Sequence, residues 1–333
     1  MDISEIQQQL FQIIKTRLPA DASVADEVAK LLEISSDSAY RRMRGEKAMT
    51  IDELYKVATQ YKISLDQLMN IQTGGFLFQG NLINPKNFRF DAYLTSMMHD
   101  MAYFVSFKHH ELYYLCKDLP IFHHWQSREF AAFKYHLWMT SIMGFPEFKK
   151  KKVDLDGYPD EIWALGQKIL GLYNQLDSFE LYNIEALNST IHQIQYYRDS
   201  QMFQSDTDVM RVYESTEKIL DHLEEQARLG YKFILGDPEK QALGKFQMFF
   251  NEILLFDNSI LAALDNTKIA MLNHTANNYM MTTSVTFSEN FYQYIQNLMR
   301  RSTMISEVSE KERSRFFRIL RERLARRKEA LEV

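Results

Sequence analysis

The segment from Ser23 to Leu68 contains the start and stop signals of three short helices in close succession. Ser23 is a residue type that caps helix N-termini, and Asp26 three positions later gives a short version of the capping box. Ala29 is small enough to let the backbone of a second helix approach closely. The apolar stripe of this helix consists of Val28, Leu31 and Leu32. These signals predict a compact helical unit.

Two further helices follow in the same segment. We expect the second over residues 36–44, because Gly45 is a residue type that ends helices. Thr50 and Glu53 have the spacing of a full capping box, which predicts the start of the third helix. An amphipathic helix predicted over residues 3–18 precedes the set.

The order of these features resembles the XRE-like DNA-binding domain of Cro and phage repressors, over roughly residues 1–72. Glu33 stands at the turn where that family usually has glycine. A residue other than glycine can adopt the left-handed turn conformation at a cost of about 1 kcal/mol. The resemblance implies a helix-turn-helix that binds double-stranded DNA with its second helix in the major groove.

The resemblance also implies which residues contact DNA. The implied set is Ser35, Ser36, Asp37, Ser38, Tyr40, Arg41, Arg42, Arg44 and Lys47. Within this set, Arg41 falls at base edges together with Ser36 and Asp37, and Arg44 falls near phosphates. Arginine can read guanine through two hydrogen bonds, whereas serine and aspartate are weaker readers. We expect all three arginines of this helix to be exposed without a packing role.

The net charge of −5 does not by itself favour DNA binding, so the distribution of charge decides. Four basic residues fall within seven positions on the second helix and its exit, and a second basic region spans residues 300–333. The acidic residues are concentrated between them, over residues 71–299. We therefore expect the bulk of the chain to be repelled by DNA while these two regions are not.

A linker is predicted over residues 73–90, because the stretch is rich in glycine and contains a proline. A helical regulatory region is predicted over residues 91–235. Its expected helices lie at about 91–118, 127–143, 159–176, 179–198 and 205–230.

The remaining residues, 236–333, are predicted to form an α+β segment. Short apolar runs separated by turn pairs indicate antiparallel strands at about 246–283, with Asp265-Asn266 as a two-residue hairpin loop. Two helices, at about 287–305 and 309–332, are expected to end the chain. The last one has an apolar side that would suit a dimer interface, formed by Phe316, Phe317, Ile319, Leu320 and Leu324. The expected fold class is mainly α, α+β overall, with a large helical C-terminal domain and a small antiparallel β-meander.

Cysteine and histidine usage favours structural roles. Cys116, the single cysteine, lies in an apolar context and indicates a buried, reduced thiol in the cytoplasm. Six of the nine histidines lie within residues 99–136, but none has the helical spacing and carboxylate support of a metal site. We expect packing roles for them, with no metal and no cofactor. Neither a nucleotide-binding nor a hydrolase motif occurs, so no enzymatic activity is expected. The sequence contains no run of 18 apolar residues, so no membrane-spanning helix and no contact with a membrane are expected.

The C-terminal part more loosely resembles a group of bacterial helix-turn-helix proteins, described mainly as transcriptional regulators. The resemblance lies in Ile121-Phe122-His123, in Phe130 to Lys134 and in Val308 to Arg313. The sequence therefore predicts a cytoplasmic, homodimeric transcription regulator with a small-molecule or peptide effector. The alternative is a protein- or peptide-binding module, such as an antitoxin or a peptide-receptor scaffold, for which DNA binding is secondary.

Overall fold

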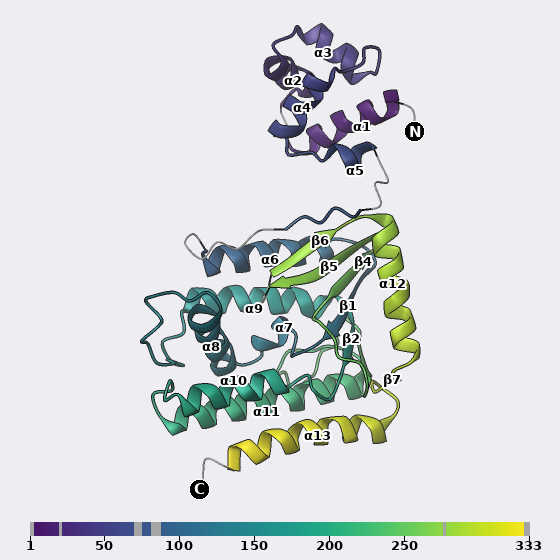
Figure 1. Ribbon diagram of the computed structural model, residues 1–333. Helices are drawn as coiled ribbons and strands as arrows, with labels where there is room; N and C mark the ends of the chain where they lie inside the picture. Colours follow the sequence, from purple (N-terminus) through teal and green to yellow (C-terminus); the bar gives the residue numbers. More distant parts are fainter. Residues whose placement is uncertain (1–2, 20–21, 70–74, 81–87, 276–277, 330–333) are drawn as a thin grey trace. The chain divides into compact units, whose positions relative to one another are not determined.

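The structure is a computed structural model that describes residues 3–19, 22–69, 75–80, 88–275 and 278–329. The chain forms two compact units, Met1–Leu77 and Phe78–Val333, which we call the head and the body. Figure 1 shows that the head consists of helices, whereas the body contains a sheet flanked by helices. Part of the predicted linker, residues 73–74 and 81–87, lies outside the described residues.

The described residues of the head form five helices. They are α1 (Ile3–Thr16), α2 (Val24–Leu32), α3 (Ser36–Met43), α4 (Ile51–Gln60) and α5 (Leu65–Met69). The predicted caps are confirmed, since the Ser23 side chain accepts from the Asp26 amide and Thr50 and Glu53 form both bonds of a capping box. Apolar side chains of the head meet in one core, and Met43 of α3 packs against it. The buried members of this core are Leu10, Phe11, Ile14, Val28, Leu32, Val57, Ile63 and Leu68.

The body is built on a mixed sheet with the strand order β6-β5-β4-β1-β2-β3-β7. Its strands are β1 (His110–Cys116), β2 (Asp177–Tyr182), β3 (Phe246–Phe250), β4 (Ile260–Leu264), β5 (Thr267–Thr275), β6 (Asn278–Thr282) and β7 (Thr303–Met304). The three strands β1, β2 and β3 are parallel, and the other neighbours are antiparallel.

Helices of the body pack against the sheet (Figure 1). They are α6 (Phe90–Val105), α7 (Ile121–His124), α8 (Arg128–Leu137), the π-helix η1 (Trp138–Ile142), α9 (Asp160–Gln175), α10 (Asn188–Asp199), α11 (Asp206–Leu229), α12 (Val285–Arg300) and α13 (Glu310–Glu329). The crossover from β1 to β2 contains α7 to α9, and the crossover from β2 to β3 contains α10 and α11.

The two faces of the sheet belong to different cores. Leu112 and Tyr114 of β1 join the large core with α6 to α11, whereas Tyr113 and Leu115 join a small core with Ile295 of α12. Successive side chains of a strand point to opposite faces, so β1 is buried on both faces from Leu112 to Cys116. Cys116, at its end, is fully buried as predicted.

The α+β fold class is confirmed, and β4, β5 and β6 form the predicted antiparallel meander, with Asp265 at a positive φ of 46° in the first hairpin. β3, which lies in the same predicted range, is instead parallel to β2 and outside the meander. The helices predicted over 91–118 and 179–198 are each partly wrong. α6 ends at Val105 and is followed by β1, and β2 precedes α10. A strand that is buried on both faces has no polar alternation, so its apolar run reads as part of a helix.

The predicted dimer surface on the last helix is wrong. Phe316, Phe317, Leu320 and Leu324 of α13 are at most 2% exposed and belong to the large core of the same chain. They pack where α13 lies along α11. These four side chains complete the fold of the body. Ile319, the fifth residue of the predicted surface, is partly buried, and one such residue does not form an apolar face for a partner.

Candidate DNA interface

The joint between α2 and α3 has the geometry of a tight helix-helix turn. Glu33 adopts the left-handed conformation, with φ 56° and ψ 43°, and the Ile34 amide donates to the Ala29 carbonyl at 3.0 Å. The Ser35 side chain then accepts from the Ser38 amide at 3.2 Å and caps α3. The expectation that Glu33 would adopt the glycine-like conformation is confirmed, and the turn fixes the angle at which α3 leaves α2.

One face of α3 is exposed and carries two of the residues expected at base edges, Asp37 and Arg41, together with Tyr40, which is expected at the margin of the groove. Asp37, Tyr40 and Arg41 are exposed, and no part of the head core lies over them. The Ser36 hydroxyl donates to Asp26 of α2 at 2.8 Å, and this bond lowers the pKa of the Asp26 carboxyl. Ser36 is thus held by α2, whereas Arg41 extends from the exposed face, with Glu46 3.9 Å away.

Arg42 was expected on the exposed face, and this expectation is wrong. Its side chain is buried, 3% exposed as a whole residue, and its guanidinium pairs with Glu53 of α4 at 2.6 Å and 3.0 Å. It also donates to the Ser38 carbonyl at 3.0 Å. Arg42 is one position beyond Arg41 and so points about 100° around the helix, toward α4. It therefore links α3 to α4 and has no donor directed outward.

The cations at the exit of α3 share one carboxylate. Glu46 accepts from Arg44 at 2.6 Å and 3.1 Å and lies 3.9 Å from Arg41. The bond from Arg44 lowers the pKa of Glu46, which stays ionised. Lys47 is exposed beside them. Arg44 and Lys47 are therefore placed to meet an anion, and Glu46 occupies the donors that a phosphate would use.

Two glutamines of α1 hold this exit in place, and the sequence analysis missed them. The buried Gln7 donates to the Arg42 carbonyl at 2.6 Å and to the Lys47 carbonyl at 2.8 Å. Gln8 donates to the Arg44 carbonyl at 3.0 Å. A signal was present in the sequence, because Gln7 is a polar residue on the apolar stripe that contains Leu10 and Ile14.

The histidines of residues 99–136 differ in their exposure. His123, His124 and His136 are buried, whereas His99 and His109 are exposed. Among the described residues, no group of three or more His, Cys, Asp or Glu side chains is arranged to hold a metal ion.

Comparison with protein families gives a match for the head of the chain. Residues 4–92 match the model of the BetR domain. BetR domains are helix-turn-helix-like DNA-binding domains, so the match supports a DNA-binding regulatory role for this chain. The BetR match covers almost all of α1, the rest of the head and the first residues of α6, about a quarter of the chain. No curated protein and no solved structure matches the chain. In the described part of the chain, no helix has the length and apolar character required to span a bilayer.

Proposed function

We propose that the chain is a sequence-specific transcription regulator of the XRE-like kind, acting in the cytoplasm, whose α3 reads double-stranded DNA in the major groove. The observation that carries the proposal is the exposed row of Asp37, Tyr40 and Arg41 on a helix fixed by a left-handed turn at Glu33. A recognition helix must present polar side chains outward while its other face holds it rigidly on the scaffold. The turn and the Arg42 ion pair supply that rigidity.

The experiment begins with selection of bound sequences from a random DNA pool and then compares two arginine variants. Arg41→Ala should relax the preference at one operator position by about 1–3 kcal/mol. Arg44→Ala should weaken binding to all sequences alike, because a phosphate contact carries no base information. Lys56→Ala removes the same charge from α4 and should leave base preference unchanged. Equal losses on selected and random DNA for both arginine variants would overturn the assignment.

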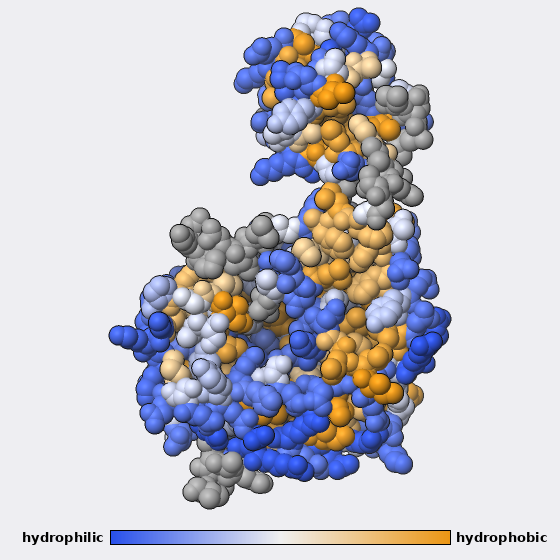
Figure 2. All heavy atoms as spheres, viewed as in Figure 1, coloured by the Kyte–Doolittle hydropathy of each residue, from blue (hydrophilic) through white to orange (hydrophobic). Residues whose placement is uncertain are grey.

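We further propose that the regulator binds as a homodimer, because one helix-turn-helix head buries little surface on DNA and a symmetric pair doubles it. An exposed apolar loop between β3 and β4 supports a dimer surface on the body, with Ile253 88% and Leu255 75% exposed. Figure 2 shows further apolar surface on the side of the body where the meander and α12 lie. Sedimentation of the full chain and of the double variant Ile253→Ser, Leu255→Ser tests this. The homodimer proposal is contradicted if the unsubstituted full chain sediments as a monomer.

The body is proposed to respond to an effector, a small molecule or a peptide, rather than to catalyse a reaction. It is far larger than a dimer contact requires, since a specific interface needs only about 800 Å² per partner. The alternative is a protein-binding module of the antitoxin kind, in which DNA binding is secondary. A stoichiometric protein that copurifies with the full chain and displaces DNA would favour that alternative.

A further inference from the structure

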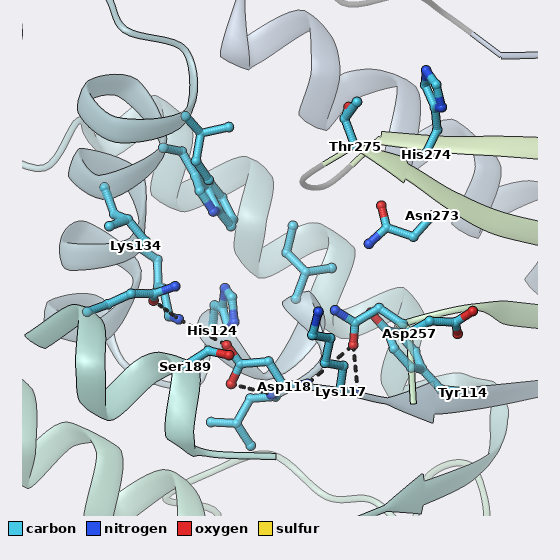
Figure 3. A pocket seen from close by; sticks show the side chains of 17 residues that line it. Tyr114, Lys117, Asp118, His124, Lys134, Ser189, Asp257, Asn273, His274 and Thr275 are labelled. Atoms are coloured by element: carbon cyan, nitrogen blue, oxygen red, sulfur yellow. Dashed lines mark hydrogen bonds and ion pairs between the residues drawn. The ribbon is translucent and has the colours of Figure 1, made fainter. Parts of the chain in front are cut away.

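The body contains a cavity of about 440 Å³ at the carboxyl end of β1. Its lining comes from segments that are far apart in the sequence, namely the residues after β1, the helices α8 and η1, the start of α10 and the last residues of β5. Figure 3 shows side chains from these elements around one hollow. The volume lies in the range of small-molecule sites.

A buried cation forms part of the wall but is already satisfied. Lys134 is 3% exposed, and its ammonium donates to Thr190 at 2.7 Å and to Gln193 at 2.8 Å. The Asp118 carboxylate, 3.6 Å away, is its counter-ion. All three protons of the ammonium are thereby directed at protein groups. This network makes the wall rigid and polar, and it engages the Asp118 carboxylate in an ion pair with Lys134.

His124 is the polar group in the cavity that lacks a partner. Its side chain is 6% exposed, yet neither ring nitrogen makes a hydrogen bond of normal geometry in the structure. Burial, together with the nearby Lys134 ammonium, lowers the pKa of His124 well below its usual range. The ring is therefore neutral at neutral pH and carries one N–H donor and one nitrogen acceptor, both buried in the wall of the cavity beside Leu119. Buried polar groups usually have partners, so this ring suits a ligand.

Lys117 supplies a charge at the mouth of the cavity. Its side chain is exposed, and Figure 3 shows it directed into the same hollow as His124. No carboxylate pairs with the Lys117 ammonium within the described ranges of the chain, since Asp118 pairs with Lys134. Asp257 accepts from the Ser259 amide, and Figure 3 shows its carboxylate turned away from Lys117. Lys117 is thus the cation of the lining that has no ion pair, while the net charge of the lining is balanced by Asp257.

The remaining lining gives the cavity two unlike walls. Leu137, Trp138 and Ile142 form an apolar wall on α8 and η1. Across from it, Asn273 of β5 points its side-chain amide toward the hollow (Figure 3). A ligand that fills this space needs a hydrocarbon part on one side and a polar group on the other.

We propose that this cavity binds a small organic carboxylate that also carries a hydroxyl group. The carboxylate pairs with Lys117, the hydroxyl bonds to His124, and the hydrocarbon part packs on Trp138. The site deepens the proposed function, because it is the effector pocket that the regulator requires. Its test measures ligand binding alone, so the ligand proposal and the DNA proposal fail independently.

The experiment uses the full chain and two hydroxy acids, 4-hydroxyphenylacetate and 6-hydroxyhexanoate, each beside its neutral primary amide. Binding is followed by tryptophan fluorescence, since Trp138 lies in the wall, and by the shift in melting temperature. At least one acid should bind saturably and about three- to tenfold more tightly than its amide.

Two variants assign the preference to residues. Lys117→Met changes an exposed side chain and should abolish the preference for acid over amide, whereas Lys311→Met, an exposed lysine of α13, should keep it. His124→Leu should weaken acid and amide alike, because it removes the partner of the hydroxyl. The proposal is overturned if neither acid binds saturably, if amides bind as well as acids, or if Lys117→Met keeps the preference.

Discussion

His123 Nε2 lies 3.1 Å from Glu180 Oε1 in the large core, and both side chains are fully buried. The hydroxyls of Tyr173 and Tyr182 also donate to the Glu180 carboxylate. Burial by itself would raise the pKa of Glu180, but the histidine and the two tyrosines lower it below its usual value. The centre of the body is therefore organised around one ionised carboxylate with three donors.

Replacing that carboxylate should destabilise the body. In Glu180→Gln the amide brings its own N–H groups toward the histidine and tyrosine donors, and we expect a loss of about 2–4 kcal/mol in the free energy of unfolding. Urea unfolding followed by tryptophan fluorescence measures it, because Trp125, Trp138 and Trp163, the only tryptophans, all lie in the body. Tyr182→Phe removes a single donor and should cost about 1–2 kcal/mol. A loss under about 0.5 kcal/mol for Glu180→Gln would show that the charge contributes little.

Lys232 should make the stability of the body depend on pH. Its ammonium is fully buried, donates to the Tyr173 carbonyl at 2.7 Å and lies 3.8 Å from the centroid of the Tyr173 ring. Burial lowers the pKa of Lys232 from the usual 10.5 to about 7, while Glu180 and Asp177 oppose the shift. Between these two values the unfolded chain binds more protons than the folded chain, so stability rises with pH. Below pH 7 both states are protonated and the dependence ends.

The measurement is the free energy of unfolding of the wild type minus that of Lys232→Met, at pH 7, 8 and 9. The difference should grow by up to about 1.4 kcal/mol per pH unit. Titration of all other groups is common to both proteins and cancels. A difference that is constant or falls over this range contradicts the buried, low-pKa lysine.

Gly166 and Gly171 on α9 offer a matched pair of substitutions. A Cβ on Gly166 would lie 2.1 Å from Cδ1 of the buried Trp125, whereas a Cβ on Gly171 would meet nothing within 4 Å. Gly166→Ala should cost about 1–3 kcal/mol by overpacking. Gly171→Ala should stabilise by up to about 1 kcal/mol, because alanine favours helix. Urea midpoints compare the two, and equal effects would show that Trp125 can move aside.

Removing Glu46 should strengthen DNA binding. Because this carboxylate occupies Arg44 and lies near Arg41, Glu46→Gln frees both cations and removes a negative charge close to the DNA backbone. We expect binding about two- to fivefold tighter on selected and random DNA alike, with a steeper salt dependence. Fluorescence anisotropy at several salt concentrations measures it. Asp66→Asn on α5 removes the same charge as a control, and unchanged or weaker binding by Glu46→Gln would contradict the prediction.

The head could be predicted in detail because its signals are local. Caps such as Thr50 with Glu53 connect residues three positions apart, and the left-handed turn at Glu33 is fixed by a pattern of consecutive residues. The partner of Arg42 is eleven positions away on another helix, and the spacing of α3 alone does not reveal it. Charged side chains are usually exposed to solvent. Arg42 is an exception, because its ion pair with Glu53 offsets the cost of removing its charge from water.

The sheet and the cavity of the body could not be predicted in this way. β1 pairs with β2 and β4, which follow it only after long intervening segments. The apolar run of β1 therefore does not reveal which strands it pairs with or in which register. The cavity gathers Lys117 and Lys134 from the crossover after β1 and Asn273 from β5. Each of these residues has an ordinary local context, and only the fold of the sheet with its crossover brings them together.

Arg42 and Glu53 divide α3 into two sets of positions that are subject to different constraints. Glu53 caps α4 and also receives the Arg42 guanidinium, so a change at either residue disturbs two helices at once. Asp37 and Arg41 make no contact of this kind and can change without a compensating change elsewhere in the head. Under the proposed function, base preference can therefore diverge among copies of such a gene while the scaffold stays constant. The same division defines which positions to randomise in engineering a head for a new DNA sequence.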